Sequence, residues 1–217
     1  MFFEEHAKLL SEFARVSQAA GARADYVQGG GGNTSVKLPG GLMAIKASGF
    51  CLSDIRPDKA YAVLDGADLR NFYLTTEPSE LADVEKEGSA RAKADIRHID
   101  GLADLRPSVE AGFHSILKTF VVHTHSVYAN LAACSTTCRP IAAQAFAGAN
   151  YTWGWVPYTD PGANLTFAIR DELRRVEAET GKAPSVILMQ NHGIIVHDDD
   201  PDTALAIHTD ANERLAR

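Results

Sequence analysis

Short apolar segments of strand character alternate with amphipathic helical segments along the chain, and this alternation most constrains the fold. Residues 120–125 and 185–189 are typical of buried strands, whereas the apolar residues between Leu165 and Val176 recur at helical spacing. Alternation of this kind predicts a layered α/β domain. Further strands are predicted at 36–38, 42–45, 61–64 and 194–196, and further helices at about 2–20, 127–134 and 202–215.

The chain length predicts one domain. Its 217 residues lie near the usual upper size for a single domain, so we expect one unit over residues 1–217. Residues 77–106 hold eight acidic residues against five Lys or Arg, with few large apolar ones. This composition predicts a surface excursion, partly helical after Ser79, and no second domain.

Charge and hydropathy exclude several classes of protein. The formal charge of −7 argues against a nucleic-acid partner, which needs clustered Lys and Arg. No apolar run approaches the roughly 20 residues that cross a bilayer, and the N-terminus has no pattern of a secretory signal. Three cysteines are too few for a disulfide framework. We therefore expect a cytoplasmic protein with a small-molecule ligand and no membrane partner.

His123 and His125 are the sharpest chemical signal. Alternate residues of a strand face the same side, so these two imidazoles can converge on one metal ion. His192 is the candidate for a third ligand, because Gly193 marks a break between two strands where a side chain can turn sideways. The alternative is structural: a His-x-His pair packed in the core and a histidine that bonds within a turn.

Glu110 is the candidate carboxylate of the same site. It is predicted in the first turn of a short helix that Ser108 caps and that leads into the His-x-His strand. There it can act as a fourth ligand or as a general base. The alternative is an exposed carboxylate that stabilises the helix dipole.

Glycine turns and hydroxyls predict an anion pocket. Backbone N–H groups in such turns bind anions, and the residues that can contribute are Gly32, Asn33, Ser48, Gly49 and Ser108. The glycine run matches neither a dinucleotide fingerprint nor a P-loop, so a ligand-free turn is the alternative. Lys46 can add charge to the pocket, although a hairpin lysine is usually solvated.

The remaining histidines need no chemistry. We expect His6, His98 and His208 on the surface and His114 packed beside Glu110. His197 ends a strand beside an acidic turn, where a salt link is expected.

Together these segments resemble the class II aldolase and adducin family, which includes fuculose-phosphate and rhamnulose-phosphate aldolases and ribulose-phosphate 4-epimerase. The resemblance covers most of the chain in family order and rests on five motifs: residues 32–35 (Gly-Asn-Thr-Ser), 45–49 (Ile-Lys-Ala-Ser-Gly), 106–110 (Arg-Pro-Ser-Val-Glu), 121–125 (Val-Val-His-Thr-His) and 190–193 (Gln-Asn-His-Gly).

The resemblance implies a three-layer α/β/α sandwich around a mainly antiparallel sheet and a cyclic homotetramer. It implies zinc as the cofactor, held by His123, His125 and His192, with Glu110 as the acid/base carboxylate. Cobalt or manganese can occupy such a site as well. Phosphate binding is implied at Gly32, Asn33, Ser48, Gly49 and Ser108.

The function implied is cleavage of a ketose phosphate or related sugar acid by a metal-dependent aldolase, through a zinc-stabilised enediolate. A 4-epimerase and a zinc-dependent dehydratase use the same site chemistry. A non-catalytic adducin-like interaction module predicts missing metal histidines, and all three are present. A metal-binding regulatory subunit is a further alternative.

Four departures from the family pattern bear on the substrate. Val109 replaces a second hydroxyl after Ser108, and Gln144 lies nearest the interface tyrosine of the family. Segment 77–106 is longer than in the short aldolases. The sequence ends at Arg217, before the tail that supplies a tyrosine in aldolases and epimerases, which weakens the epimerase alternative most.

Overall fold

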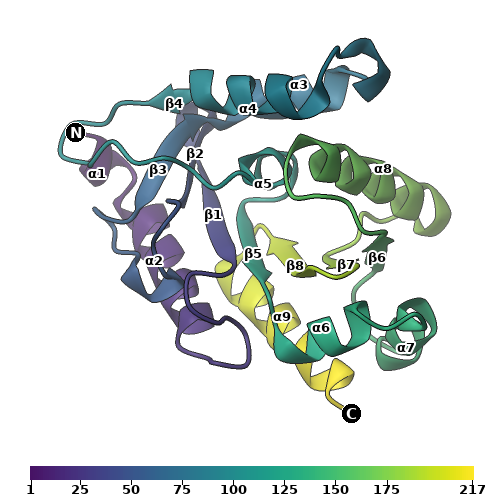
Figure 1. The fold of residues 1–217 in the computed structure, drawn as a ribbon. Helices are drawn as coiled ribbons and strands as arrows, with labels where there is room; N and C mark the ends of the chain where they lie inside the picture. The colour runs from purple at the N-terminus through teal and green to yellow at the C-terminus, as the bar shows by residue number, and fades with distance from the viewer.

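The computed structural model describes residues 1–217 and is built around one eight-stranded sheet (Figure 1). The strand order is β4-β3-β2-β1-β5-β8-β7-β6, and every neighbouring pair is antiparallel except β6 and β7. The strands are β1 (Asn33–Leu38), β2 (Leu42–Lys46), β3 (Tyr61–Asp65), β4 (Ile96–Arg97), β5 (Phe120–Thr124), β6 (Trp153–Val156), β7 (Val186–Met189) and β8 (Gly193–Asp198).

Helices cover both faces of the sheet, which confirms the three-layer α/β/α arrangement with a mainly antiparallel sheet (Figure 1). One face carries α2 (Ala7–Gly21), α6 (Val127–Ala133), α7 (Cys138–Ala145) and α9 (Pro201–Leu215), with the short α1 (Phe2–Glu5) before α2. The other face carries α3 (Gly66–Thr75), α5 (Ala111–Ile116) and α8 (Ala163–Thr180), with α4 (Val84–Ala94) packed on α5 and α8. Three short 3₁₀ turns complete the elements: η1 (Pro39–Gly41), η2 (Leu52–Asp54) and η3 (Pro78–Glu80).

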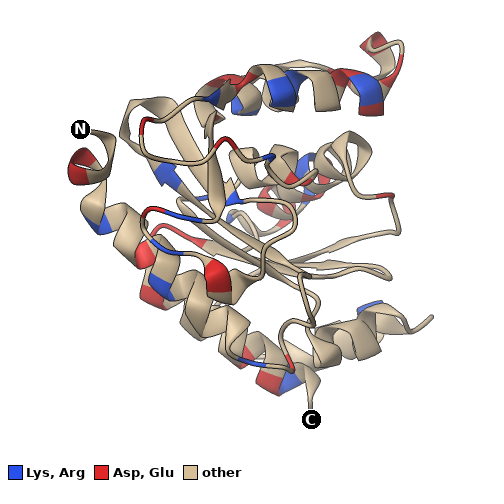
Figure 2. Cartoon of the chain, turned by 60° about the vertical axis from the view of Figure 1, so that its left-hand side comes forward, with Lys and Arg blue, Asp and Glu red and all other residues tan.

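The core lies in two layers because both faces of the sheet are buried. Val122 packs in the cluster beneath α2, whereas its neighbour Val121 packs in the cluster beneath α5 and α8. Strands buried on both faces read as continuous apolar runs, which is why the sequence shows little alternation there. Charged residues are concentrated on the helices and loops, and the strands carry few of them (Figure 2).

Local signals in the sequence account for several element boundaries. Gly40 and Gly41 adopt positive φ angles of 77° and 79° in the turn between β1 and β2, a conformation that favours glycine. Gly181 ends α8 in the left-handed conformation, and the Asp200 carboxylate caps α9 by accepting a hydrogen bond from the backbone N–H of Thr203. Glycine and aspartate at these positions therefore account for the turn between β1 and β2, the end of α8 and the start of α9.

Segment 77–106 supplies α4 to one helical layer and β4 to the sheet. Asp83 caps α4, and α4 packs closely on α8 at Gly88, where an added Cβ would lie 2.4 Å from the Cβ of Ala163. β4 pairs with β3 and forms one edge of the sheet. The sequence predicted helix in this segment but did not predict β4, nor did it predict α3, α7 and β6 elsewhere.

Candidate metal and acid–base site

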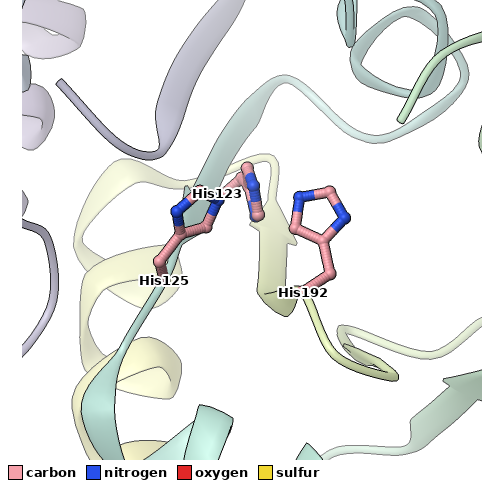
Figure 3. Close-up of side chains that lie close together, drawn as sticks. All are labelled: His123, His125 and His192. Atoms are coloured by element: carbon pink, nitrogen blue, oxygen red, sulfur yellow. The ribbon is translucent and has the colours of Figure 1, made fainter. Parts of the chain in front are cut away.

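Three imidazoles from two parts of the chain converge at one end of the central strands (Figure 3). His123 lies on β5, His125 directly follows that strand, and His192 lies in the turn between β7 and β8. The ring centroids are 5.0 to 5.3 Å apart, and one nitrogen of each ring lies within 4.8 Å of the others. We call these three residues the histidine cluster.

Strand pairing and a tight turn bring His192 to the cluster. β5 and β8 are antiparallel neighbours, so the turn before β8 returns to the end of β5 where His125 lies. Asn191 has a φ of 54°, and a Cβ on Gly193 would lie 2.4 Å from the carbonyl oxygen of Thr124. Gly193 is therefore required for close contact between the two strands, as the sequence pattern indicated.

His123 has the geometry of a neutral imidazole with a free lone pair. Its side chain is fully buried, and Nδ1 donates a hydrogen bond to the carbonyl oxygen of Ile194 at 3.0 Å. Nε2 then carries the lone pair, and it has no hydrogen-bond partner. Burial lowers the pKa of His123 to about 3 and also lowers the pKa of His125, so both rings are neutral at neutral pH. An unpartnered, neutral and oriented Nε2 is what a metal ligand requires.

Glu110 is buried beside the cluster and is not the exposed dipole partner that was the alternative. Its Oε1 lies 3.0 Å from Nε2 of His192, and its Oε2 lies 3.7 Å from Nε2 of His123. Oε1 nevertheless has no hydrogen bond. Burial alone would raise the pKa of Glu110, but the imidazoles and the Asn33 amide outweigh it and hold that pKa below its usual value.

The chain path that presents Glu110 differs from the prediction. α5 begins at Ala111, so Glu110 occupies the N-cap position and Ser108 lies before the helix. The Glu110 side chain makes no capping hydrogen bond, and it points instead to the histidine cluster. The prediction of Ser108 as N-cap was wrong, because Pro107 directly before it still pairs with Ala47 and the helix begins only at Ala111.

Asn33 and Ser108 lie next to Glu110, and Gly32 lies against the backbone of His123. The Asn33 amide donates to Oε2 of Glu110 at 2.5 Å and to Oγ of Ser108 at 3.1 Å. Gly32 has a φ of 70°, and an added Cβ would lie 2.6 Å from the carbonyl oxygen of His123. These three residues therefore join the site, although both donors of the Asn33 side chain already have protein partners.

Ser48 and Gly49 do not contact Glu110 or the histidine cluster directly, and Ser48 is bonded to Arg106, two residues before Ser108. Ser48 donates its backbone N–H to the carbonyl oxygen of Arg106 at 2.8 Å, and Arg106 donates to Oγ of Ser48 at 3.3 Å. Gly49 has a φ of 90° at the turn. The glycine turn and the segment that carries Ser108 and Glu110 are thus tied together.

Lys46 was expected to be solvated, and that prediction was wrong. The side chain is buried, and Nζ donates to the carbonyl oxygen of Phe50 at 2.7 Å and to that of Gly30 at 3.4 Å. These bonds hold together the two glycine turns, one at residues 29–32 and the other at residues 48–50. Burial lowers the pKa of the Lys46 ammonium group. The sequence feature that could have predicted this burial is the position of Lys46 within the apolar run of residues 42–47.

The burial of the other histidines differs in part from the prediction. His98 is exposed and His114 is buried next to Glu110, as expected, but His6 and His208 are buried. His208 bonds Oγ1 of Thr124 at 2.8 Å and packs on Tyr26. His197 is buried and accepts from the backbone N–H of Lys118 at 3.4 Å, so the expected salt link is absent.

No helix of the structure combines the length and apolar character that a membrane crossing requires. A comparison with curated protein sequences gives no match.

Three solved structures share the fold at low sequence identity. The N-terminal class II aldolase domain of a conserved Thermoplasma acidophilum protein is 21% identical with a TM-score of 0.76, covering 95% of this chain and 92% of that one. An L-fuculose 1-phosphate aldolase is 18% identical with a TM-score of 0.62, covering 97% and 84%. A sugar-phosphate aldolase from Thermotoga maritima is 15% identical with a TM-score of 0.61, covering 97% and 94%.

The family is established by the sequence itself. The family model described as Class II Aldolase and Adducin N-terminal domain matches residues 11–217, nearly the whole chain. That range includes the histidine cluster, Glu110 and both glycine turns. The chain therefore belongs to the class II aldolase and adducin N-terminal domain family.

Proposed function

We propose that this chain is a metal-dependent lyase that cleaves a carbon–carbon bond in an anionic ketose, either a ketose phosphate or a related sugar acid. The observation that carries the proposal is a pair of buried atoms without hydrogen bonds, Nε2 of His123 and Oε1 of Glu110, which lie in one site. Buried polar atoms without partners are rare in folded proteins and call for an explanation. A cation between the imidazoles and the carboxylate would satisfy both atoms.

His123, His125 and His192 are the proposed ligands of that ion. Three protein ligands with an open position are typical of catalytic zinc sites, and neutral imidazoles favour Zn²⁺ while also accepting cobalt or manganese. When bound, such an ion supplies a Lewis acid that polarises a substrate carbonyl.

Glu110 is the proposed acid/base. Its Oε1 has no hydrogen bond, so this oxygen is free to carry a proton, while Oε2 is held by Asn33. In the condensation direction Glu110 would remove a proton from the carbon next to the substrate carbonyl, and in the cleavage direction it would return that proton. The lowered pKa keeps the carboxylate ionised and ready to accept a proton at neutral pH.

Gly32, Asn33, Ser48, Gly49 and Ser108 are the proposed contacts of the anionic end of the substrate. Lys46 supports this assignment, because its Nζ contacts only carbonyl oxygens and its positive charge lies beneath both glycine turns. A structural relative that is an L-fuculose 1-phosphate aldolase makes ketose phosphates the first probes to use. Holding the anion at one end would position the reacting carbons at the other.

The test is product analysis with the zinc-loaded protein on a panel of ketose 1-phosphates, ketose 5-phosphates and sugar acids. Release of an aldehyde and a second fragment supports the aldolase. A product that is a stereoisomer of the substrate would identify an epimerase instead. A product that has lost water would identify a dehydratase. Bound zinc with no turnover on the whole panel would favour a non-catalytic metal-binding protein.

Assembly and location are further parts of the proposal. Val127 and Leu131 are exposed one helical turn apart on α6, and such a face supports the proposed homotetramer. Light scattering in solution tests the assembly state. The three free cysteines support a reducing, cytoplasmic location, which fractionation of the source cells tests.

A further inference from the structure

We propose that Ser35, His114 and Asn33 form a directed chain of hydrogen bonds that holds the Glu110 carboxylate in its working position, with His114 as a positioning residue. The chain begins at Oγ of Ser35, which lies 2.8 Å from Nδ1 of His114. Nε2 of His114 bonds Oδ1 of Asn33, and Nδ2 of Asn33 bonds Oε2 of Glu110. The proposal rests on the proposed function, because it assigns the chain to the acid/base carboxylate.

The donor of each hydrogen bond can be assigned by working back from the Glu110 carboxylate. An ionised carboxylate only accepts, so Asn33 must present its NH₂ group to Glu110 and its carbonyl oxygen to His114. An amide oxygen only accepts, so Nε2 of His114 must carry the hydrogen. Nδ1 of the neutral ring is then an acceptor, and the Ser35 hydroxyl must donate to it. Every donor therefore points toward the negative charge of Glu110.

The surroundings of the chain keep these bonds in place. Ser35, His114 and Asn33 are at most 4% exposed, so water does not compete for their polar atoms. The ring of Phe113 stacks on His114 with an angle of 23° between the planes. Aligned hydrogen bonds in a buried site polarise one another, which strengthens the last bond to the carboxylate.

The consequence is that the two oxygens of Glu110 have separate roles. Oε2 is held by Asn33, and Oε1 has no hydrogen bond and faces His192. Without His114, the carbonyl oxygen of Asn33 would lose its partner, and only the bonds of Nδ2 to Ser108 and Glu110 would hold the amide. Glu110 would then lose its fixed direction, although none of its own contacts had been substituted.

The first test uses two-bond ¹⁵N–¹H NMR of the imidazoles in the metal-free protein to find which ring nitrogen of His114 carries the hydrogen. We expect His114 to be neutral with its hydrogen on Nε2, and we expect that proton resonance to move upfield in Glu110→Gln, because the charge at the end of the chain is removed. A hydrogen on Nδ1, or a resonance that does not respond to Glu110→Gln, would overturn the proposal. This measurement needs no substrate, so it decides the proposal even if the proposed function fails.

The second test uses the ketose that product analysis identifies. We expect His114→Leu to lower kcat by about 10- to 100-fold with KM and zinc content unchanged, because misplacement of a catalytic group acts on the chemical step. His114→Gln should recover most of kcat, since its side-chain amide can donate to Asn33. His197→Gln is the control, because His197 is also buried but lies at the far end of β8.

Equal losses of kcat in His114→Leu and His197→Gln would show a purely structural role, and failure of His114→Gln to recover kcat would contradict the donor role. If His114→Leu does not fold, His114→Gln and the NMR spectrum of the wild type still decide.

Discussion

The two ends of the central strands both gather polar side chains, but the atoms of those side chains are engaged differently. At the end that holds the histidine cluster, Nε2 of His123 and Oε1 of Glu110 have no partner. The opposite end opens into a cavity of about 630 Å³ with five cationic side chains in its lining: Lys37, Arg70, Lys118, Arg170 and Arg174.

The cations of the far end are engaged in holding the fold. Lys37 donates to the carbonyl oxygen of His114, and Arg70 donates to those of Ser115 and Ile116. These three carbonyl oxygens lie in the last turn of α5. Cations are favoured there because the carbonyls have no partner within the helix and the helix dipole is negative at its C-terminus. Lys118 pairs with Asp198 at 2.9 Å, and Arg170 pairs with Glu77 at 3.1 Å.

The difference teaches that cavity volume is a poor guide to the functional end of this molecule. The cavity of the far end is lined by cationic side chains whose hydrogen bonds stabilise α5 and the surrounding turns. At the histidine cluster, two unpartnered atoms of opposite character, Nε2 of His123 and Oε1 of Glu110, face one space that a cation would fill, whereas at the far end only Nε2 of His197 is unpartnered. Substitutions at the two ends should therefore have separate effects, on chemistry at one and on stability at the other.

The largest expected effect on turnover is at Glu110. Glu110→Gln keeps the size of the side chain and removes its ability to carry a proton, so we expect kcat to fall by about 10²- to 10⁴-fold. Zinc content should stay at the wild-type value, since the three imidazoles are unchanged. Steady-state kinetics and metal analysis on the same preparation check both points, and wild-type turnover in this variant would remove Glu110 from the mechanism.

Acidification should destabilise the metal-free protein through histidines at both ends. Burial lowers the pKa of His123, His197 and His208 from 6.5 to about 3. Between these values the unfolded chain binds protons that the folded protein excludes, so the free energy of unfolding falls as pH drops from about 6.5 toward 3. The expected slope is about 1.4 kcal/mol per pH unit for each histidine.

Urea unfolding at a series of pH values measures that slope. His197→Gln should reduce it by the contribution of one histidine, at the far end of the strands and without effect on zinc binding. An unchanged slope in this variant would contradict the lowered pKa of His197.

The smallest expected effect is at the far end. Arg70→Met removes two hydrogen bonds to the end of α5, and we expect a loss of about 0.5–1.5 kcal/mol in the free energy of unfolding. Zinc content and kcat should be unchanged in the folded variant. Loss of either one, with stability retained, would show that the large cavity takes part in function and would break the comparison.

Much of the site could be predicted because its chemistry follows local patterns. His123 and His125 are two residues apart at the end of a strand, and Gly193 marks the turn that carries His192. Burial of polar residues could not be predicted in the same way. His208 is buried because α9 lies against Tyr26 and Thr124, and Lys46 because two glycine turns close over it. Such neighbours come from distant parts of the chain, so local polarity predicts a surface position instead.

The elements that the sequence did not predict are short or lack a clear boundary signal. β6 has four residues, Trp153–Val156, and pairs in parallel with β7 through a connection that includes all of α8. α7 begins at Cys138 without a side-chain capping bond from Thr137. β4 has two residues and exists through its pairing with β3. The layers could be predicted from the longer elements, whereas these edges depend on tertiary contacts.

The most direct test of the central claim is a count of bound metal. The protein is stripped with a chelator, reloaded with Zn²⁺, freed of excess ion and measured by elemental analysis. We expect about one zinc per chain in the wild type and in His98→Ala, whose histidine is exposed, and none in His125→Ala. A wild type that holds no zinc, or a His125→Ala variant that holds as much as the wild type, would contradict the assignment of the histidine cluster as a metal site.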